Sequence, residues 1–272
     1  MLTQQQLQYF QTFGFLLLRK VFDPDELKII SAEYEKGLAF AREGATQVGG
    51  RRQLNWPNMG PRTPHITKLL EDPRICGVAE DLLGEDSVAV GTNGNHFGGH
   101  YSEWHPDTHD PNLRGIKFLN YLQPLDGDGG ALRVVPGSHL SPFHDEVFRI
   151  AMKEHNYGDG EESGLSVAEV PAFVCKTEPS DLIVFNLRTW HATWGGTTDR
   201  RMCSFNYYAN PRTPEEQAAT RAMVAIDQQV QKSLRWKEPQ FAPEWIANPD
   251  SSPKRQRWIM WLTHWGFIEV AG

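Results

Sequence analysis

The sequence predicts a mainly β protein with flanking helices, in which short strands form a sandwich or barrel. Between residues 87 and 210, short apolar segments alternate with Gly, Pro and Asp clusters, a pattern typical of antiparallel sheets. No helical segment separates these strands, so a parallel βαβ sheet is not expected. Helical periodicity is concentrated before residue 87 and after residue 210.

The chain length favours one domain over two. With 272 residues, 39% hydrophobic and 22% charged, the chain is ordinary for a globular protein. We therefore expect a single domain over 1–272, with an N-terminal helical part (1–86), a β core (87–210) and a C-terminal helical extension (211–272).

Three helices and one strand are expected in the N-terminal part. Each helix begins at a side chain able to cap it, Thr3, Asp23 or Asp72, and the first and third end at glycine. The expected helices cover 3–14, 23–38 and 72–84, and the strand is Phe15–Leu18. A Gly-, Pro- and Arg-rich loop over 47–64, with Arg51, Arg52 and Trp56, is either a lid over substrate or an ordinary surface loop.

Seven strands are expected in the β core. They cover 87–90, 100–105, 116–122, 132–135, 166–170, 182–186 and 201–209. After them, Trp258, Trp261 and Trp265 repeat at i, i+3 and i+7, a spacing that favours helix packing over ligand recognition.

Composition excludes several classes of partner. The net charge is -7 and basic residues are scattered, so the chain lacks the positive face that nucleic acids require. No apolar run is long enough to cross a membrane, and the N-terminus does not resemble a signal peptide, so we expect a cytoplasmic protein that binds a small molecule. The cysteines at 76, 175 and 203 are expected to be reduced and buried. Oligomeric state is not predicted.

The segment Glu103-Trp104-His105-Pro106-Asp107 carries the first pattern with chemical meaning. Side chains two apart in a strand point to one face, so His105 and Asp107 present an imidazole and a carboxylate side by side. The similar triplet His144-Asp145-Glu146 is a weaker candidate because no strand precedes it.

His191 follows another apolar strand and is expected to reach the same barrel mouth. Two histidines and one carboxylate occupy one face of an octahedral ion and leave the opposite face open. Oxygen and imidazole donors with open positions favour iron(II) over a closed zinc site. His105, Asp107 and His191 are therefore the expected catalytic metal ligands.

Arg200 is the expected anchor for a carboxylate cosubstrate. A guanidinium binds a carboxylate through two parallel hydrogen bonds. Period two places Arg200 on one face with Ser204, and Arg201 on the other face, so Arg200 and Ser204 are the expected inward pair.

Further contacts are expected around this pair. Lys117 and Asn120 follow the first metal segment on opposite strand faces, so at most one points inward, and Asn120 is preferred as a cosubstrate contact. Arg188, Trp190 and Trp56 are candidate substrate contacts.

Over most of its length the chain resembles the phytanoyl-CoA dioxygenase family of iron(II)- and 2-oxoglutarate-dependent oxygenases. The similar segments are Phe13-Gly14-Phe15-Leu16, Trp104-His105-Pro106-Asp107, the run from Gly129 to Pro136-Gly137-Ser138-His139, and Pro179-Ser180-Asp181 to His191 followed by Arg200.

The resemblance implies a double-stranded β-helix, which is a cupin-like jelly roll, with helical extensions at both ends. It implies iron(II) as cofactor, with 2-oxoglutarate and O2 as cosubstrates, and a hydroxylation or related oxidation that releases succinate and CO2. A non-catalytic jelly-roll binding protein, and a cupin-type dioxygenase or isomerase without 2-oxoglutarate, are the alternatives. The sequence does not select a substrate.

Overall fold

Ten strands form two antiparallel sheets in the part of the chain that the computed structural model describes, residues 1–43, 53–98, 102–154, 170–196, 199–233, 236 and 238–269. The six-stranded sheet has the order β1-β8-β5-β10-β3-β2, and the four-stranded sheet has the order β4-β9-β6-β7. The strands are β1 (Phe15–Leu18), β2 (Gln53–Pro57), β3 (Val88–Phe97), β4 (Ser102–His105), β5 (Gly115–Tyr121), β6 (Gly129–Val134), β7 (Phe173–Cys175), β8 (Leu182–Asn186), β9 (His191–Gly195) and β10 (Arg200–Tyr208).

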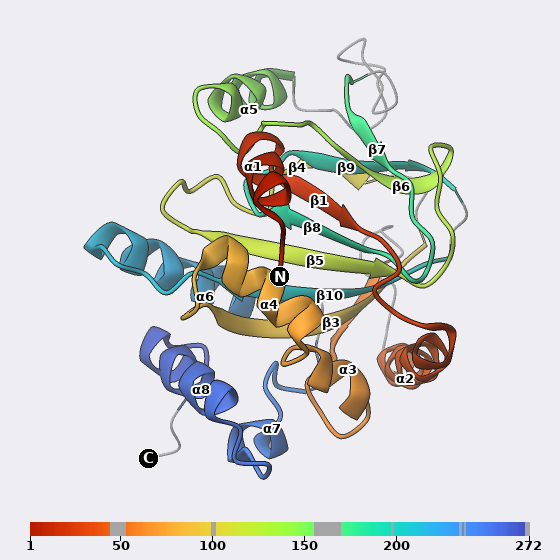
Figure 1. Ribbon diagram of the computed structural model, residues 1–272, viewed down its shortest axis with the longest axis vertical. Helices are drawn as coiled ribbons and strands as arrows, with labels where there is room; N and C mark the ends of the chain where they lie inside the picture. Colours follow the sequence, from red (N-terminus) through yellow and green to blue (C-terminus); the bar gives the residue numbers. More distant parts are fainter. Residues whose placement is uncertain are drawn as a thin grey trace.

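Consecutive strands pass back and forth between the sheets. From β3 the chain crosses to β4, returns to β5, crosses to β6 and β7, and then alternates through β8, β9 and β10. This winding is a double-stranded β-helix, so the predicted fold class is confirmed. In Figure 1 the smaller sheet lies over the larger one, and their facing surfaces enclose the interior.

The described helices lie outside the two sheets. They are α1 (Gln4–Phe13), α2 (Pro24–Arg42), α3 (Pro64–Leu69), α4 (Pro73–Leu83), α5 (Phe143–Glu154), α6 (Pro214–Ser233), α7 (Pro243–Ala247) and α8 (Pro253–Trp265). Helices α2, α4 and α8 contact the larger sheet, and α5 lies beyond the smaller one (Figure 1). No described helix is both long and apolar enough to span a bilayer.

The N-terminal helices begin and end as their capping residues predict. Thr3 and Gln6 form a reciprocal capping box, and Gly14 ends α1 with a φ of 82°, in the left-handed region. The Asp23 carboxylate accepts hydrogen bonds from the first-turn amides of α2, and Asp72 caps α4 in the same way.

The two faces of the larger sheet have different surroundings. Phe118, Val184 and Phe205 lie on the outer face and pack with the helices in one core cluster. Leu119 and Ile183 lie on the inner face and pack toward the smaller sheet. Because strand side chains alternate, this division assigns the residues of β5, of β8 and of β10 up to Asn206 to one face or the other.

Several strand boundaries differ from the prediction. Strand β3 continues through the polar run 92–97, because its backbone pairs with both β10 and β2 and tertiary pairing outweighs the low strand propensity of Asn and Gly. Strands β2, β7 and β9 were not predicted. Most of the expected strand 166–170, and the arginines at 51 and 52 of the suggested lid, lie outside the described residues.

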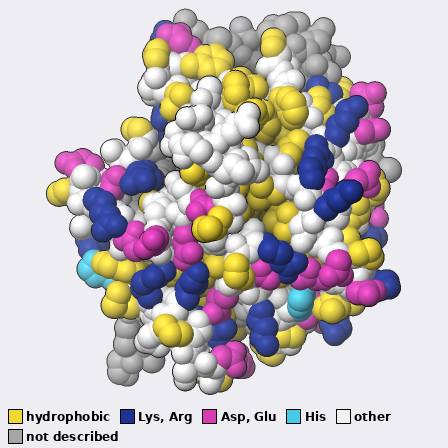
Figure 2. Space-filling view, viewed as in Figure 1, with side chains coloured by type: hydrophobic (Ala, Val, Ile, Leu, Met, Phe, Trp, Pro, Cys, Tyr) yellow, Lys and Arg dark blue, Asp and Glu magenta, His cyan; other side chains and the backbone are white. Residues whose placement is uncertain are grey.

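The tryptophan stripe of α8 packs as predicted. Trp258 is 1% exposed and its Nε1 donates to the carbonyl of Ser87, next to β3, while Trp265 is also buried. The three cysteines are free and buried, as expected. On the face shown in Figure 2, acidic and basic side chains are interspersed.

Candidate metal centre

His105 and His191 are direct cross-strand neighbours in the smaller sheet. Strand β4 pairs with β9 so that the two residues stand opposite one another, and their ring centroids are 4.4 Å apart. Directly opposed residues of an antiparallel pair share a face, so both imidazoles point to the same side of the sheet. The Phe185 ring, 4.7 Å from that of His191, identifies this side as the interior.

Asp107 joins the two histidines just beyond the end of β4. Its backbone N–H donates to the carbonyl of Leu187 at 2.8 Å, which ties this segment to the end of β8. One ligand atom from each of His105, Asp107 and His191 lies within 4.8 Å of the others, and no other such group occurs among the described residues. The structure therefore brings together the three residues that the sequence predicted as metal ligands.

Backbone carbonyls fix both imidazole rings. Nδ1 of His191 lies 2.9 Å from the carbonyl of Thr189, and Nδ1 of His105 lies 2.8 Å from that of Glu103. A carbonyl only accepts, so each Nδ1 carries the hydrogen and each Nε2 lone pair is free. This orientation is the usual support for a metal-binding histidine.

The carboxylate of Asp107 is held on one oxygen only. Oδ1 accepts from Nζ of Lys117 at 2.8 Å, whereas Oδ2 is buried and has no hydrogen-bond donor among the described residues. Buried polar atoms are rarely left unpaired. A cation held by Asp107 and the two histidines would account for this one.

The electrostatics favour the protonation states that a metal needs. Burial lowers the pKa of His191 to about 3, with the neighbouring His105 adding to the shift. Burial alone would raise the pKa of Asp107, but Lys117 and the two imidazoles outweigh it and hold that pKa below its usual value. His191 is thus neutral and Asp107 ionised at neutral pH, and two imidazoles with one carboxylate fit iron(II).

Arg200 lies on the inner face of β10 and is 5% exposed. Its Nη1 donates to the carbonyl of Gly130 at 3.3 Å, and its guanidinium carbon lies 4.6 Å from the Phe97 ring centroid. Burial lowers its pKa. No carboxylate among the described residues pairs with it, which leaves it available to an anionic ligand.

Arg201 points the other way, as the alternation of strand side chains predicts. It forms ion pairs with Glu35 of α2, at 2.5 Å, and with Asp199. Ser204 shares the inner face with Arg200 and stands opposite Leu119 and Asn93. The relative orientation predicted for Arg200, Arg201 and Ser204 is the one observed.

The structure does not place Asn120 on the inner face, where the sequence predicted a cosubstrate contact. Asn120 lies on the outer face of β5 with Phe118, and its Nδ2 donates to the carbonyls of Pro179 and Asp181. At most one of Lys117 and Asn120 was expected to point inward. In the structure it is Lys117, which lies on the inner face with Leu119.

Of the three substrate candidates, Trp56 and Trp190 face away from the metal ligands. Trp56 pairs with Gly94 on the outer face and packs on Tyr34 of α2. Trp190 precedes His191 and therefore points to the opposite side of the smaller sheet, into a cluster with Trp104 beneath α5. Arg188 donates to the carbonyl of His139, a structural contact. In this structure the two tryptophans pack in core clusters and Arg188 binds the backbone of the segment that contains His139.

Sequence reasoning did not identify the polar residues of the inner face. Asn93 and Asn95 of β3, with Asn206 of β10, share the face of Ser204 by register. The Oδ1 atom of Asn93 is buried without a donor among the described residues. The alternating Asn93-Gly94-Asn95 pattern could have revealed them, but the expected strand ended at residue 90.

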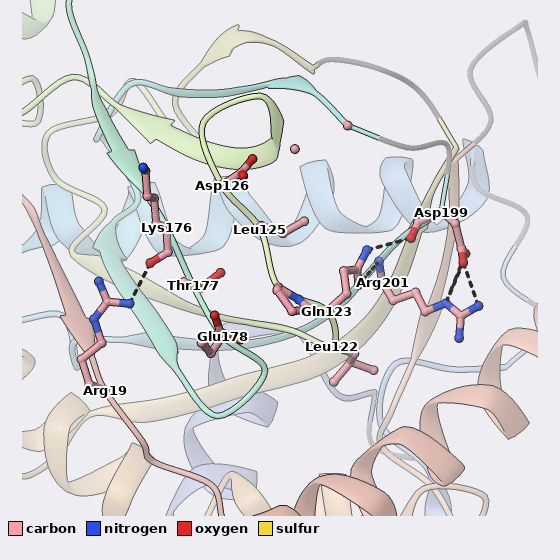
Figure 3. Close-up of a pocket in the computed structure, with 13 residues that line it drawn as sticks. Arg19, Leu122, Gln123, Leu125, Asp126, Lys176, Thr177, Glu178, Asp199 and Arg201 are labelled. Carbon is pink, nitrogen blue, oxygen red and sulfur yellow. Dashed lines mark hydrogen bonds and ion pairs between the residues drawn. The ribbon is translucent and has the colours of Figure 1, made fainter.

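The residues drawn in Figure 3 line a cavity of about 780 Å³. The charged residues in its wall include Arg19, Lys176, Asp199 and Arg201, and none of the three metal-ligand candidates lines it. Its arginines are engaged, because Arg19 donates to the carbonyl of Lys176 and Arg201 pairs with Asp199 (Figure 3). The cavity is therefore not part of the candidate centre.

The chain matches a family model and several curated relatives. The model described as Phytanoyl-CoA dioxygenase (PhyH) matches residues 10–203. Ectoine dioxygenase of Bordetella bronchiseptica is 23% identical over 215 residues, covering 71% of this chain and 70% of the relative. Ectoine dioxygenase of Sphingopyxis alaskensis is 24% identical over 220 residues, covering 72% of each.

Solved structures share the fold. HygX from Streptomyces hygroscopicus, with nickel and 2-oxoglutarate bound, has a TM-score of 0.62 at 20% identity, covering 77% of this chain and 88% of HygX. EctD from S. alaskensis, with 2-oxoglutarate and 5-hydroxyectoine, has a TM-score of 0.56 at 20% identity, covering 76% of both chains. At these identities the likeness shows the double-stranded β-helix alone.

Proposed function

The chain belongs to the phytanoyl-CoA dioxygenase family of non-haem iron(II)- and 2-oxoglutarate-dependent dioxygenases, and we propose that it hydroxylates a small polar molecule. The observation that carries this proposal is the inward convergence of His105, Asp107 and His191 in the same interior as Arg200. A protein that only binds small molecules has no need of three oriented metal donors.

Each residue of the interior has a distinct part in the proposed reaction. His105, Asp107 and His191 hold the iron, and Arg200 holds the distal carboxylate of 2-oxoglutarate. When bound, iron(II) supplies the oxidation of the substrate by O2, coupled to the conversion of 2-oxoglutarate to succinate and CO2. Lys117 orients Asp107, and the apolar residues of the inner face exclude water around the reacting atoms.

The inner face favours a polar substrate over an acyl chain. Asn93, Asn95, Ser204 and Asn206 share that face and offer amide and hydroxyl groups. Such groups bind ligands through hydrogen bonds and are costly to bury against a hydrocarbon. The relatives named ectoine dioxygenase, and the HygX structure with hygromycin B bound, agree with a small polar substrate but do not identify it.

Succinate formation tests the proposed function. Purified protein is incubated with iron(II), ascorbate and labelled 2-oxoglutarate, first alone and then with panels of small polar metabolites. We expect slow succinate release alone, faster release with a substrate, and neither in His191→Ala. Absence of succinate under every condition would favour a non-catalytic binding protein. Full activity of Arg200→Ala would favour a metal dioxygenase or isomerase that does not use 2-oxoglutarate.

A further inference from the structure

Helix α6 turns one carboxyl group toward the protein. Thr220, Val224 and Asp227 are spaced i, i+4 and i+7 and lie on one face, and the first two are buried. Asp227 is partly buried, whereas its neighbours Ile226 and Val230 are 50% and 44% exposed. The carboxyl group of Asp227 is therefore directed inward from the face on which α6 packs.

Asp227 lies at the end of the sandwich that carries the metal centre. Figure 1 shows α6 beside the ends of β5 and β10 that contain Gly115 and Tyr208. Burial raises the pKa of Tyr208, and Asp227 and Asp107 add to the shift. Burial raises the pKa of Asp227 to about 7, with Lys117 opposing and Asp107 adding to the shift, so its charged neighbours belong to the metal centre.

Asp227 has no cationic partner within the part of the chain that the structure describes. No hydrogen bond or ion pair to its carboxylate occurs there, and Lys117 is already engaged by Asp107. The Asp181 carboxylate, by comparison, accepts hydrogen bonds from the Arg19 guanidinium and from the backbone amides of Lys20 and Glu178. A partly buried carboxylate without a partner is destabilising, and a cation from outside the protein relieves that cost.

The anionic cosubstrate is expected at the other end of the interior. Arg200, the proposed 2-oxoglutarate anchor, begins β10, while Tyr208 ends it. The residues between them on the inner face, Met202, Ser204 and Asn206, are uncharged. Asp227 is therefore placed where a substrate approaches the metal centre from the side opposite the cosubstrate.

We propose that Asp227 binds a positively charged group of the substrate, so that the substrate is a small polar molecule carrying a protonated amine. This inference rests on the proposed oxygenase function and names the substrate class for the same site. Asp227 supplies the ion pair, and the asparagines of the inner face supply neutral hydrogen bonds. Asp227 lies beyond residue 203, outside the part of the chain that the family model matches.

The test compares primary amines with their N-acetylated counterparts, which have a similar shape but no charge. With iron(II), 2-oxoglutarate and ascorbate, we expect the amine of an accepted pair to stimulate succinate release with a kcat/KM at least tenfold above that of its counterpart. Asp227→Asn is expected to raise the KM for the amine at least tenfold while changing the KM for 2-oxoglutarate less than twofold. Asp227→Glu is expected to restore part of the affinity.

The control variant is Glu215→Gln, which removes one negative charge from an exposed position of the same helix. It is expected to leave the KM for the amine unchanged. Calorimetric titration of nickel-loaded protein with the same amines provides a readout without turnover, in which Asp227→Asn is expected to weaken binding by the same factor.

The outcomes separate the role of Asp227 from the oxygenase function. Succinate release by the wild type without preference for any amine, or equal KM values in wild type and Asp227→Asn, overturns the role of Asp227 and leaves the oxygenase function intact. Absence of succinate under all conditions overturns the oxygenase function itself.

Discussion

Lys117 Nζ lies 2.8 Å from Oδ1 of Asp107, and this contact determines which carboxylate oxygen remains for a metal. The two residues come from different parts of the fold. Lys117 is on the inner face of β5, and Asp107 follows β4 of the other sheet. Because one oxygen is engaged by the lysine, the carboxylate presents a single free oxygen beside the two imidazoles. The metal centre is thus assembled across the interior rather than on one sheet alone.

Replacement of Lys117 by methionine is expected to weaken metal binding about tenfold, the lower limit for residues that orient a ligand. The methionine fills the space but lets the carboxylate rotate. Equilibrium titration with cobalt(II) measures the effect, and Lys28→Met, at an exposed lysine, is the control. Removal of a positive charge would by itself favour a dication, so tighter binding in Lys117→Met would contradict the orienting role.

Replacement of His191 by alanine is expected to abolish specific metal binding and to lower succinate formation at least 100-fold. The imidazole is one of only three donors, and two remaining donors do not define a face of an octahedral ion. Cobalt(II) absorption and succinate release are the measurements. His96→Ala, which removes a histidine paired with Asp199, is the matched control and should retain both.

Replacement of Arg200 by alanine is expected to raise the KM for 2-oxoglutarate by 10-fold to 100-fold, because a charge-assisted double hydrogen bond is lost. The KM of Arg200→Lys should lie between those of the wild type and Arg200→Ala, since an ammonium binds only as a point charge. Arg201→Ala, at the neighbouring exposed position, should change this KM less than twofold. A larger effect at Arg201 would reverse the assignment.

The depressed pKa of His191 predicts an acid-sensitive apoprotein. The folded-state pKa of about 3 lies below the unfolded value near 6.5, so the unfolded state binds the proton first as the pH falls. This difference lowers the free energy of unfolding by about 2 kcal/mol between pH 7.5 and pH 5. Urea unfolding of chelator-treated protein at the two pH values measures the loss. A variant with His191→Asn should lose correspondingly less stability, and an equal loss would contradict the assignment.

The sequence was most informative where function depends on neighbours along the chain. His105 and Asp107 are two residues apart at a strand end, and Arg200 and Ser204 share a strand face, so local periodicity was sufficient to orient them. The position of His191 after an apolar strand was sufficient to place it at the barrel mouth, but its pairing opposite His105 depends on a register that no local pattern reveals.

The orientation of Trp190 follows from the same alternation of strand side chains. Trp190 adjoins His191, and adjacent strand residues face opposite ways, so proximity in sequence was a poor guide. Asn93 and Asn95 were missed because β3 extends only through pairing with two other strands. Asp227 could not be predicted, because the packing of α6 against the barrel end has no local sequence pattern.

The C-terminal extension is proposed to fold as one unit with the β core, and Trp258 provides the test. Trp258 is fully buried, its Nε1 donates to the carbonyl of Ser87, and its ring contacts Tyr207 of β10, so it joins α8 to the sheet. Replacement by alanine is expected to lower the free energy of unfolding by about 3–5 kcal/mol, the usual cost of truncating a buried tryptophan. Met260→Ala, 54% exposed on the same helix, should change it by less than about 0.5 kcal/mol. If α8 and the barrel form one cooperative unit, urea unfolding of Trp258→Ala remains a single transition that shifts equally by tryptophan fluorescence and by circular dichroism. A separate early transition, with the barrel unfolding at the wild-type midpoint, would show that the extension is an independent unit.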